Sequence, residues 1–467
     1  MEQAELRATG SLAAIFAMRL LGLFMIYPVF AGYARHLQGA TPMMTGLALG
    51  AYGLTQGLLQ IPFGLLSDRI GRKTMISIGL VLFGIGSIVA ALSGSIAGVL
   101  IGRVLQGTGA VGSVILASVA DRTREEVRTK AMAIVGMTIG LSFVVAIIVG
   151  PILASLIGVP GIFWLTAALA LVGIAITQAA LPTPSRLTRH RDAEAVPALF
   201  GRVLGNGELL RLDFAIFALH AILTASFLAI PGLLAGSLHL GTPTDWMVYL
   251  PVLLASVALM VPAIIIAEKG GRMKEVFIAA ILLLSASVVA LALAGNIAVV
   301  AILALVGFFT AFNVMEAMLP SLVTKIAPAG AKGTATGVYS TMQFLGIFVG
   351  GLGGGWAFAE AGGKGVFGFT LSMALLWLVI AATMHRPGRT SSYVLRLGEI
   401  EPDEGASIEA KLKTAPGVIE AVAVPGEGAA YLKIDRTKFD PASVAQFVRA
   451  GHADLMTAGE AARPHPE

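Results

Sequence analysis

Long runs of apolar residues recur from near the N-terminus to about residue 386, and short segments between them hold most of the charges. Each run has roughly 20 residues, which lets an α-helix cross a hydrocarbon core about 30 Å thick. Backbone groups find no water in lipid, so such runs are satisfied as helices. The pattern predicts about twelve membrane-spanning helices, at 11–34, 43–66, 75–94, 96–119, 131–156, 161–181, 211–236, 246–267, 275–294, 298–326, 334–357 and 364–385.

A polar segment at 182–210 divides these helices into two sets of six, at 11–181 and 211–386. The loop at 268–274 is a weaker copy of the loop at 64–73, and it occupies the same place in the second set. Matching loops in matching places indicate an internal duplication. In membrane transporters such repeats form two bundles that move about a site near the midplane.

The first apolar run is too long for the core of a signal peptide and lacks a small-residue cleavage site followed by soluble sequence, so we expect it to remain. Basic residues set the orientation, because they gather in alternate loops while the opposite loops carry little beyond Arg35 and Lys364. The positive-inside rule then predicts cytoplasmic termini, linker and tail, in a multi-pass protein of a bacterial inner membrane.

The net charge of +5 follows from these basic loops, so no nucleic-acid partner is expected. The chain contains no cysteine, which excludes disulfides, thiolate metal sites and cysteine catalysis. Hydrophobic residues make up 56% of the chain and charged residues 13%, as expected of a protein whose main partner is the lipid bilayer.

The loop at 64–73 concentrates charge and glycine between two predicted helices. Its two glycines permit a tight turn, and Asp68 is placed to pair with Arg122 or Arg128 of the next basic loop and to cap a neighbouring helix. We interpret the set as a latch that holds the two bundles together on one side of the membrane, the alternative being an ordinary solvated loop. The set consists of Gly64, Asp68, Arg69, Gly71, Arg72, Lys73, Asp121, Arg122 and Arg128.

This loop resembles the loop signature of the major facilitator superfamily, and 121–128 is similar to its companion in the next loop. The segment 101–109, which contains Arg103, resembles the intramembrane arginine motif of the same family. The resemblance implies the 12-helix facilitator fold, a small-molecule substrate moved by alternating access, no cofactor, and a latch role for the loop. An α-helical membrane protein of two six-helix bundles is therefore the predicted fold class.

Gly150-Pro151 resembles a motif of the drug-antiporter branch of that family. Ala146 stands where the branch has a glycine, and Ala154-Ser155 replace a following glycine pair, which weakens the expectation of antiport. Small residues also allow close helix packing with no transport role, and this alternative stays open.

Ionisable side chains inside a bilayer are candidates for function, because a central charge costs roughly 2.5–3.5 kcal/mol on insertion scales. Arg19, Arg103 and Glu316 are the clearest, and Glu316 is the one carboxylate expected near the middle of the membrane. We predict that Glu316 carries the coupling proton, with Asp213 and His220 as further candidates. The alternative for Glu316 is a static pairing with an arginine.

Several further side chains on the predicted helices are candidates for the wall of a solute cavity, although packing against lipid or a neighbour is the alternative for each. They do not identify the substrate. They are Tyr27, Gln56, Gln60, Phe227, Asn313, Gln343 and Phe344.

Residues 392–457 have a soluble pattern that predicts a small βαββαβ, ferredoxin-like domain with strands near 393–397, 418–424, 429–434 and 452–457. Parts of it are similar to heavy-metal-associated domains, which bind soft metals through a Cys-x-x-Cys loop. Here 401–405 reads Glu-Pro-Asp-Glu-Gly, so we expect no metal site. A small ligand or a protein partner of this tail is left open.

These patterns favour a secondary active transporter, without enzymatic activity or cofactor, that exports a small lipophilic or drug-like solute in exchange for protons. The chain has no Gly-x-x-x-x-Gly-Lys-Ser/Thr phosphate loop for nucleotide-driven transport. The alternatives are a sugar or metabolite exporter, and a sensor or scaffold that signals through its tail. A membrane enzyme is the least favoured class.

Overall fold

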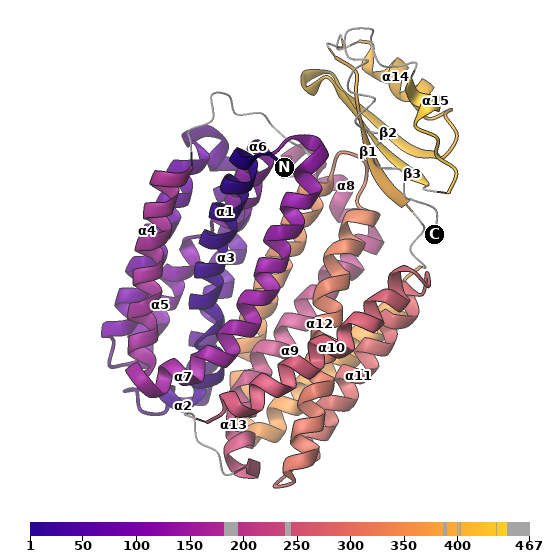
Figure 1. Ribbon diagram of the computed structural model, residues 1–467. Coiled ribbons are helices and arrows are strands. Elements are labelled where there is room, and N and C mark those ends of the chain that lie inside the picture. The colour runs from indigo at the N-terminus through magenta and orange to yellow at the C-terminus, as the bar shows by residue number, and fades with distance from the viewer. Residues whose placement is uncertain are drawn as a thin grey trace.

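The computed structural model describes residues 1–181, 195–238, 244–385, 390–398, 400, 403–435 and 437–445. Long helices stand side by side, and a small sheet lies at one end of them (Figure 1). The N-terminus lies at the same end as the sheet, which we call the tail side, and the opposite end is the far side. Residues 182–194 of the predicted linker and the last predicted strand, 452–457, lie outside the described residues.

The first half of the helical body follows the predicted runs closely. Its helices are α1 (Gln3–Phe24), α2 (Tyr27–Ala34), α3 (Pro42–Ile70), α4 (Arg72–Leu92), α5 (Ile96–Thr108), α6 (Gly112–Asp121) and α7 (Glu125–Ala180). The first and fourth predicted runs are each divided into two helices, at residues 25–26 and 109–111.

The second half begins after a short turn η1 (Pro197–Leu199) and helix α8 (Phe200–Leu204). Its long helices are α9 (Gly207–Leu238), α10 (Trp246–Glu268), α11 (Met273–Leu293), α12 (Ala298–Ile326) and α13 (Lys332–Ala382).

Two helices are too long for a single crossing. A helix as long as α7, with 56 residues, or α13, with 51, would extend well beyond twice the thickness of a hydrocarbon core at 1.5 Å per residue. Each is interrupted by a glycine with positive φ, Gly158 at 70° in α7 and Gly362 at 60° in α13. Glycine adopts this conformation without steric cost. The interruptions fall where the sequence predicts a loop between two spans.

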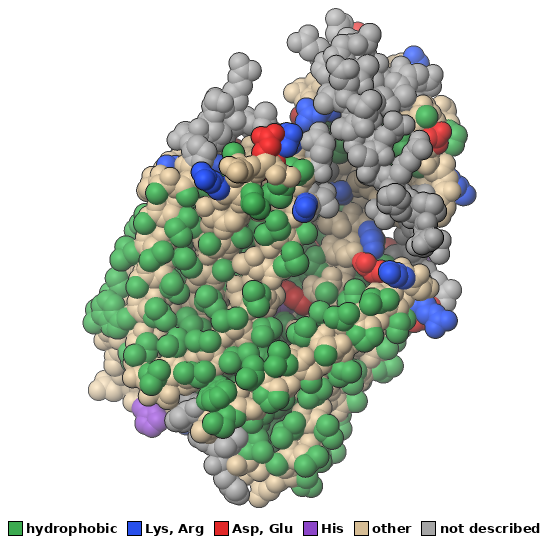
Figure 2. Space-filling view, in the orientation of Figure 1, with side chains coloured by type: hydrophobic (Ala, Val, Ile, Leu, Met, Phe, Trp, Pro, Cys, Tyr) green, Lys and Arg blue, Asp and Glu red, His purple; other side chains and the backbone are tan. Residues whose placement is uncertain are grey.

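Nine helical stretches among the described residues are long and apolar enough to cross a membrane, and two of them are the 51-residue stretches 130–180 and 332–382. Their outward faces are apolar: in Figure 2 the visible flank is largely green, and blue and red side chains gather at the tail side. An exception is an acidic side chain at the floor of a groove between the two halves. The apolar flank is the surface expected of a protein surrounded by lipid.

The two halves meet along a glycine seam between α3 and α13. A Cβ on Gly46 would collide with the carbonyl oxygen of Gly351, and a Cβ on Gly53 with that of Phe344. Within the second half, Gly346 and Gly350 of α13 contact the backbone of α9 in the same way. Small residues therefore bring three helix backbones together, as membrane helices commonly require.

The tail forms a three-stranded antiparallel sheet in the order β1-β3-β2. Its described elements are β1 (Thr390–Arg396), α14 (Gly405–Leu412), β2 (Val418–Val424), η2 (Pro425–Glu427), β3 (Ala429–Asp435) and α15 (Ala442–Ala445). A separate apolar core, which includes Leu395, Leu412 and Leu432, lies under the sheet. A small C-terminal sheet is thus present where the sequence predicts the tail, and its three strands are antiparallel.

Candidate functional site

Glu316 lies on α12, ten residues before the tail-side end of that helix, and 26% of its side chain is exposed. Its Oε2 is 3.9 Å from Nε2 of His220 on α9. The His220 Nδ1 lies 3.2 Å from the carbonyl oxygen of Ile216, which accepts hydrogen bonds only, so Nδ1 carries a proton. Nε2 then accepts a hydrogen bond from the amide nitrogen of Gln343 at 2.8 Å. The imidazole is neutral in this arrangement.

Two further polar side chains extend this group along the helices. Asn313, nearly one turn from Glu316, donates a hydrogen bond of 2.9 Å to Ser256 of α10. Asp213 lies on α9, two turns from His220 toward the tail side, and is 2% exposed. The structure thus brings Glu316, His220 and Gln343 together, with Asn313 nearly one turn from Glu316 on α12. Asp213 is buried on α9, the helix that carries His220, and does not lie at the surface.

Arg19 and Arg103 lie in the first half, and both are close to Tyr52. Their guanidinium carbons are 5.8 Å and 5.1 Å from the centre of the Tyr52 ring, within the range of a cation–π contact. Arg103 also donates a hydrogen bond of 2.7 Å to Gln106. The ion pairs of the described residues include none between Glu316 and either arginine.

The cavity candidates of the first half form a polar chain with Arg19. Arg19 donates to Gln56, and Gln56 donates to Gln60 at 2.7 Å. Phe344 comes from the other half and contacts the edge of the Tyr52 ring at 6.2 Å between centroids. Gln60 and Phe344 lie where the two halves meet. Among its described parts, the structure does not gather all the predicted cavity residues around a single pocket.

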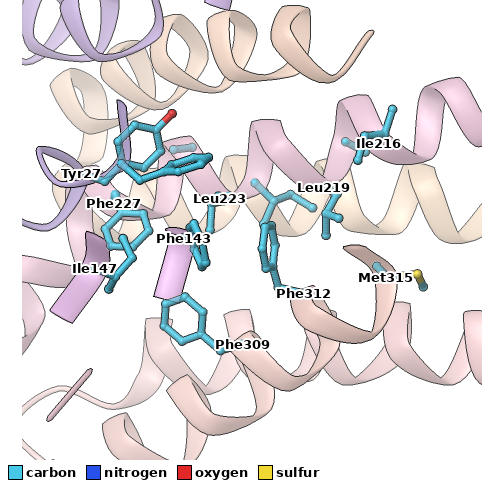
Figure 3. Packing of buried hydrophobic residues seen from close by; sticks show 14 of the residues in the cluster. Tyr27, Phe143, Ile147, Ile216, Leu219, Leu223, Phe227, Phe309, Phe312 and Met315 are labelled. Carbon is cyan, nitrogen blue, oxygen red and sulfur yellow. The ribbon is translucent and has the colours of Figure 1, made fainter. Parts of the chain in front are cut away.

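An aromatic layer joins the halves on the far side of Glu316. Tyr27 meets Phe227 with ring centroids 5.6 Å apart, and Phe143 of α7 meets Phe312 of α12 at 5.3 Å. Figure 3 shows these rings packed with Phe309 and with aliphatic side chains of α7 and α9. Tyr27 and Phe227 are fully buried here. The layer separates Glu316 from the far side in this conformation.

Arg72 organises the charged loop between α3 and α4. It is 3% exposed, forms an ion pair with Asp68 and donates from Nε to Asp121 at 3.0 Å. Gly71 makes the turn with φ of 93°, and Lys73 donates to the carbonyl oxygen of Gln178 at 2.9 Å. The loop therefore fastens α3, α4, α6 and α7 of the first half to one another.

The expected partner of Asp68 was Arg122 or Arg128, and the structure gives it Arg72 instead. Arg122 donates to the Ser118 hydroxyl, Arg69 is exposed, and Gly64 accepts from Arg72. Asp68 also lines a narrow space of about 40 Å³ together with Gly333 and Thr336, from the first turn of α13. The carboxylate thus faces the start of a helix of the other half, although its ion pair lies within its own half.

Gly150 is a site of close helix contact. A Cβ at this position would collide with the carbonyl oxygen of Met25, where α1 ends. Pro151 follows in the helix. This close backbone contact is a sufficient reason for glycine at position 150, without any role in transport.

The tail is docked on the loop between α12 and α13, which the sequence did not predict. Glu420 of β2 forms an ion pair with Arg202 of α8 and accepts from the Ala329 amide at 3.0 Å. Lys433 of β3 donates to the carbonyl oxygen of Ile326 at 2.8 Å. Burial lowers the pKa of the Lys433 ammonium, and the Glu420 carboxylate opposes that shift. Such long-range pairs leave no periodic signal in the sequence.

A cleft of about 1520 Å³ separates the docked tail from the loops of the first half. Arginines line both of its walls, Arg69 and Arg124 from the helical body and Arg396 from β1. Among the described residues no group of three or more His, Asp or Glu side chains could hold a metal ion. The tail thus contacts the second half and faces the first.

Two halves of spanning helices, joined at a glycine seam and carrying buried charges near the middle, define a membrane transport protein rather than an enzyme. A sequence profile described as Major Facilitator Superfamily matches residues 12–241 and 212–413. The chain belongs to the major facilitator superfamily.

The relatives found by sequence comparison cover most of the chain. The Inner membrane transport protein YajR of Escherichia coli (strain K12) is 42% identical over 452 residues, which cover 96% of this chain and 98% of the relative. An uncharacterized transporter of Buchnera aphidicola is 34% identical over 74% of this chain and 89% of its own length.

Solved structures agree on the fold. The human organic anion transporter MFSD10 has a TM-score of 0.60 at 18% identity and covers 81% of this chain and 100% of its own. A bacterial homologue of the lysosomal transporter Spinster, inward-facing and unoccupied, has a TM-score of 0.62 at 15% identity, with 82% and 96% covered. The predicted family, the multi-pass membrane location and the absence of an enzyme class are confirmed by the family membership.

Proposed function

We propose that this transporter couples the movement of a small solute to protons, with Glu316 as the group that binds and releases the proton. The supporting observation is a partly exposed carboxylate in the membrane interior with a neutral imidazole 3.9 Å away and no described ion pair to an arginine or lysine. A carboxylate held in a pair by a cation would stay ionised through the cycle. Glu316 has no such restraint, so it is free to alternate between charged and neutral forms.

Proton binding lowers the free energy that is needed to keep the Glu316 side chain in the membrane interior. An ionised carboxylate is expensive in the membrane interior, by roughly 2.5–3.5 kcal/mol on insertion scales, and a protonated one is cheaper. The aromatic layer lies on the far side of Glu316. Opening and closing that layer would therefore change whether water from the far side reaches the carboxylate. A change in access linked to a change in charge is the physical requirement for coupling.

The proposal includes the number of membrane crossings, the orientation in the membrane and the fold of the tail. Twelve helices in two sets of six fit the two interrupted helices, α7 and α13, as two crossings each. The basic residues at the tail side favour the cytoplasm for that side, and the printed name of the Escherichia coli relative supports an inner membrane location. The described strands of the tail fit the first three strands of a ferredoxin-like domain.

A regulatory role for the tail is favoured by its docking. It contacts the loop that connects α12, which carries Glu316, to α13, which carries Gln343. A ligand or protein that displaced the tail would therefore act on both helices of the proton site. A sensor that uses the fold without transport would share this arrangement, so transport itself must be measured.

The test is a flux assay on the purified full-length protein in liposomes that contain a pH-sensitive dye. The panel comprises lipophilic cations, organic anions, sugars and amino acids, each added outside in the absence of other gradients. Proton movement that depends on one solute class, and that is absent from empty liposomes, is the expected result. Uptake of a radiolabelled solute without any proton movement would reject proton coupling, and no response to the panel at any pH would favour the sensor.

A further inference from the structure

Two positive charges lie inside the first half without an acidic partner. Arg19 of α1 is 4% exposed, and Arg103 of α5 is fully buried. The sequence has no Asp or Glu at 6–67, 69–120 or 127–181, which contain the predicted spans of this half. The ion pairs of the described residues include neither arginine. Because arginine stays protonated in proteins, this half holds two uncompensated charges in the membrane interior.

The partners of Arg19 in the described structure are neutral. Its guanidinium carbon lies 5.8 Å from the centre of the Tyr52 ring and 5.6 Å from that of the Phe83 ring. The guanidinium also donates to the amide oxygen of Gln56. Ring faces and an amide orient the guanidinium, but they carry no negative charge to balance it.

Arg103 contacts the same tyrosine and is also held by neutral groups. Its guanidinium carbon is 5.1 Å from the centre of the Tyr52 ring. It donates to the side chain of Gln106 at 2.7 Å and to the carbonyl oxygen of Leu49 at 3.4 Å. Two cations near one ring repel each other, so a negative group placed near that ring would be attracted by both.

The Tyr52 ring lies where the two halves meet. It contacts the Phe344 ring of α13 at 6.2 Å between centroids. The hydrogen bonds from Arg19 through Gln56 to Gln60 lead to the same boundary, because Gln60 lines the narrow space that α3 and α13 share. Separation of α3 from α13 would therefore open a path from the space between the halves toward the guanidinium groups.

We propose that Arg19 and Arg103 recognise an oxyanion group of the transported solute. The planar guanidinium fork matches the two oxygen atoms of a carboxylate or a phosphate, and it binds them by charge-assisted hydrogen bonds. Such a group supplies the negative charge that the spans of the first half lack. The solute is thus an organic anion.

The rest of the solute is apolar, because the walls around the two arginines are aromatic. The Tyr52 ring has the Phe83 ring 6.5 Å away within its own half and the Phe344 ring across the boundary. Rings of this kind favour a flat, apolar body beside a polar group that fixes its orientation. An aromatic acid combines both features.

The inference adds a solute class to the proposed function and does not depend on which residue carries the proton. Glu316 lies in the second half and has no described ion pair to either arginine. Glu316→Gln should therefore bind the anion as the wild type does. Its transport assay tests the proposed proton role separately.

The test uses four probes that share one aromatic ring and differ in charge. Benzoate and phenyl phosphate are anions, benzamide is neutral, and benzyltrimethylammonium is a cation. A probe that binds the folded protein raises its unfolding midpoint, which is measured for the purified full-length chain in one detergent at constant ionic strength. We expect a rise with one or both anions and none with benzamide or the cation, and the comparison of the two anions separates a carboxylate solute from a phosphate.

Variants connect the effect to the two arginines. Arg19→Gln and Arg103→Gln should each weaken anion binding by about tenfold or more, because each removes a charged donor. Arg19→Lys keeps the charge without the fork and should give a smaller loss, so it also serves if a glutamine variant does not fold. Arg7→Gln is the matched control, since Arg7 is an exposed arginine of the same helix. It should bind the anions as the wild type does.

Three results would overturn the inference. The first is an equal response to benzoate, phenyl phosphate and benzamide, and the second is no response to either anion. The third is anion binding that both Arg19 variants leave unchanged, because the anion would then bind elsewhere. Anion binding in a protein that moves no protons would remove the proposed coupling and leave the anion site in place.

Discussion

Arg72 illustrates how much of this structure depends on single buried charges. Sequence motifs identify the loop as important, but spacing alone does not say which acid meets which base. The structure gives Arg72 two carboxylates, Asp68 at i−4 and Asp121 from α6. The helical i, i+4 spacing of Asp68 and Arg72 is a signal that the sequence did contain.

Arg72→Gln should destabilise the protein strongly, because the buried Asp121 carboxylate and the half-buried Asp68 carboxylate lose their cation. Breaking a buried pair from one side costs about 3–5 kcal/mol. Arg69→Gln, three residues away and exposed, should change stability by less than about 0.5 kcal/mol. Unfolding midpoints of both variants in the same detergent measure the difference, and equal midpoints would show that Arg72 has no special structural role.

Asp68→Asn should favour the conformation open at the tail side, because Asp68 faces the first turn of α13 across the narrow space between the halves. The chain has no native cysteine, so single cysteines can be introduced on each side without background labelling. We expect tail-side cysteines to react faster with an impermeant maleimide, and far-side cysteines more slowly, than in the parent. An unchanged ratio would contradict the latch.

At the scale of helices, the hydrophobic pattern predicts most boundaries to within a few residues. It locates the Gly158 and Gly362 interruptions because the apolar runs there exceed one membrane thickness. It does not predict which helices touch, since small residues permit close contact without specifying the neighbour. The α3 to α13 seam and the contact of Gly150 with Met25 come from the structure.

Gly150→Ala should destabilise the protein, since the added methyl group collides with the Met25 backbone and overpacking costs about 1–3 kcal/mol. Gly140→Ala is a control in the same helix, because no atom lies within 4 Å of its Cβ position. That change should be neutral or stabilising by about 0.5–1 kcal/mol. Thermal unfolding in detergent distinguishes the two, and equal effects would contradict the packing explanation.

Lys433→Met should loosen the docked tail, because the ammonium group donates to carbonyl oxygens of residues 326 and 327. Lys438→Met, an exposed position on the same unit, is the control. Hydrogen exchange of 327–331 should become faster by several-fold in Lys433→Met and stay unchanged in Lys438→Met.

Deletion of the chain after Arg389 should also make hydrogen exchange of 327–331 faster, and it should leave a folded, inserted transporter with an altered transport rate. Complete loss of transport by the inserted deletion variant would contradict a regulatory tail.

At the scale of the whole molecule, motifs and composition predict the family, the membrane location and a small soluble unit at the C-terminal end. The intramembrane Glu316 could be selected from the sequence because buried charges are rare. The docking of the tail could not be predicted, because it depends on a few contacts between distant parts of the chain.

The central claim is that Glu316 carries the coupling proton. The most direct measurement compares Glu316→Gln with Glu360→Gln, an exposed position on α13, in liposomes loaded with the solute identified by the panel. Glu316→Gln keeps the size of the side chain and removes its titration, so uphill transport driven by a pH gradient should fall to background. Exchange of labelled for unlabelled solute, which needs no net proton movement, should persist, and Glu360→Gln should behave as the wild type. Uphill transport by Glu316→Gln at the wild-type rate would contradict the account.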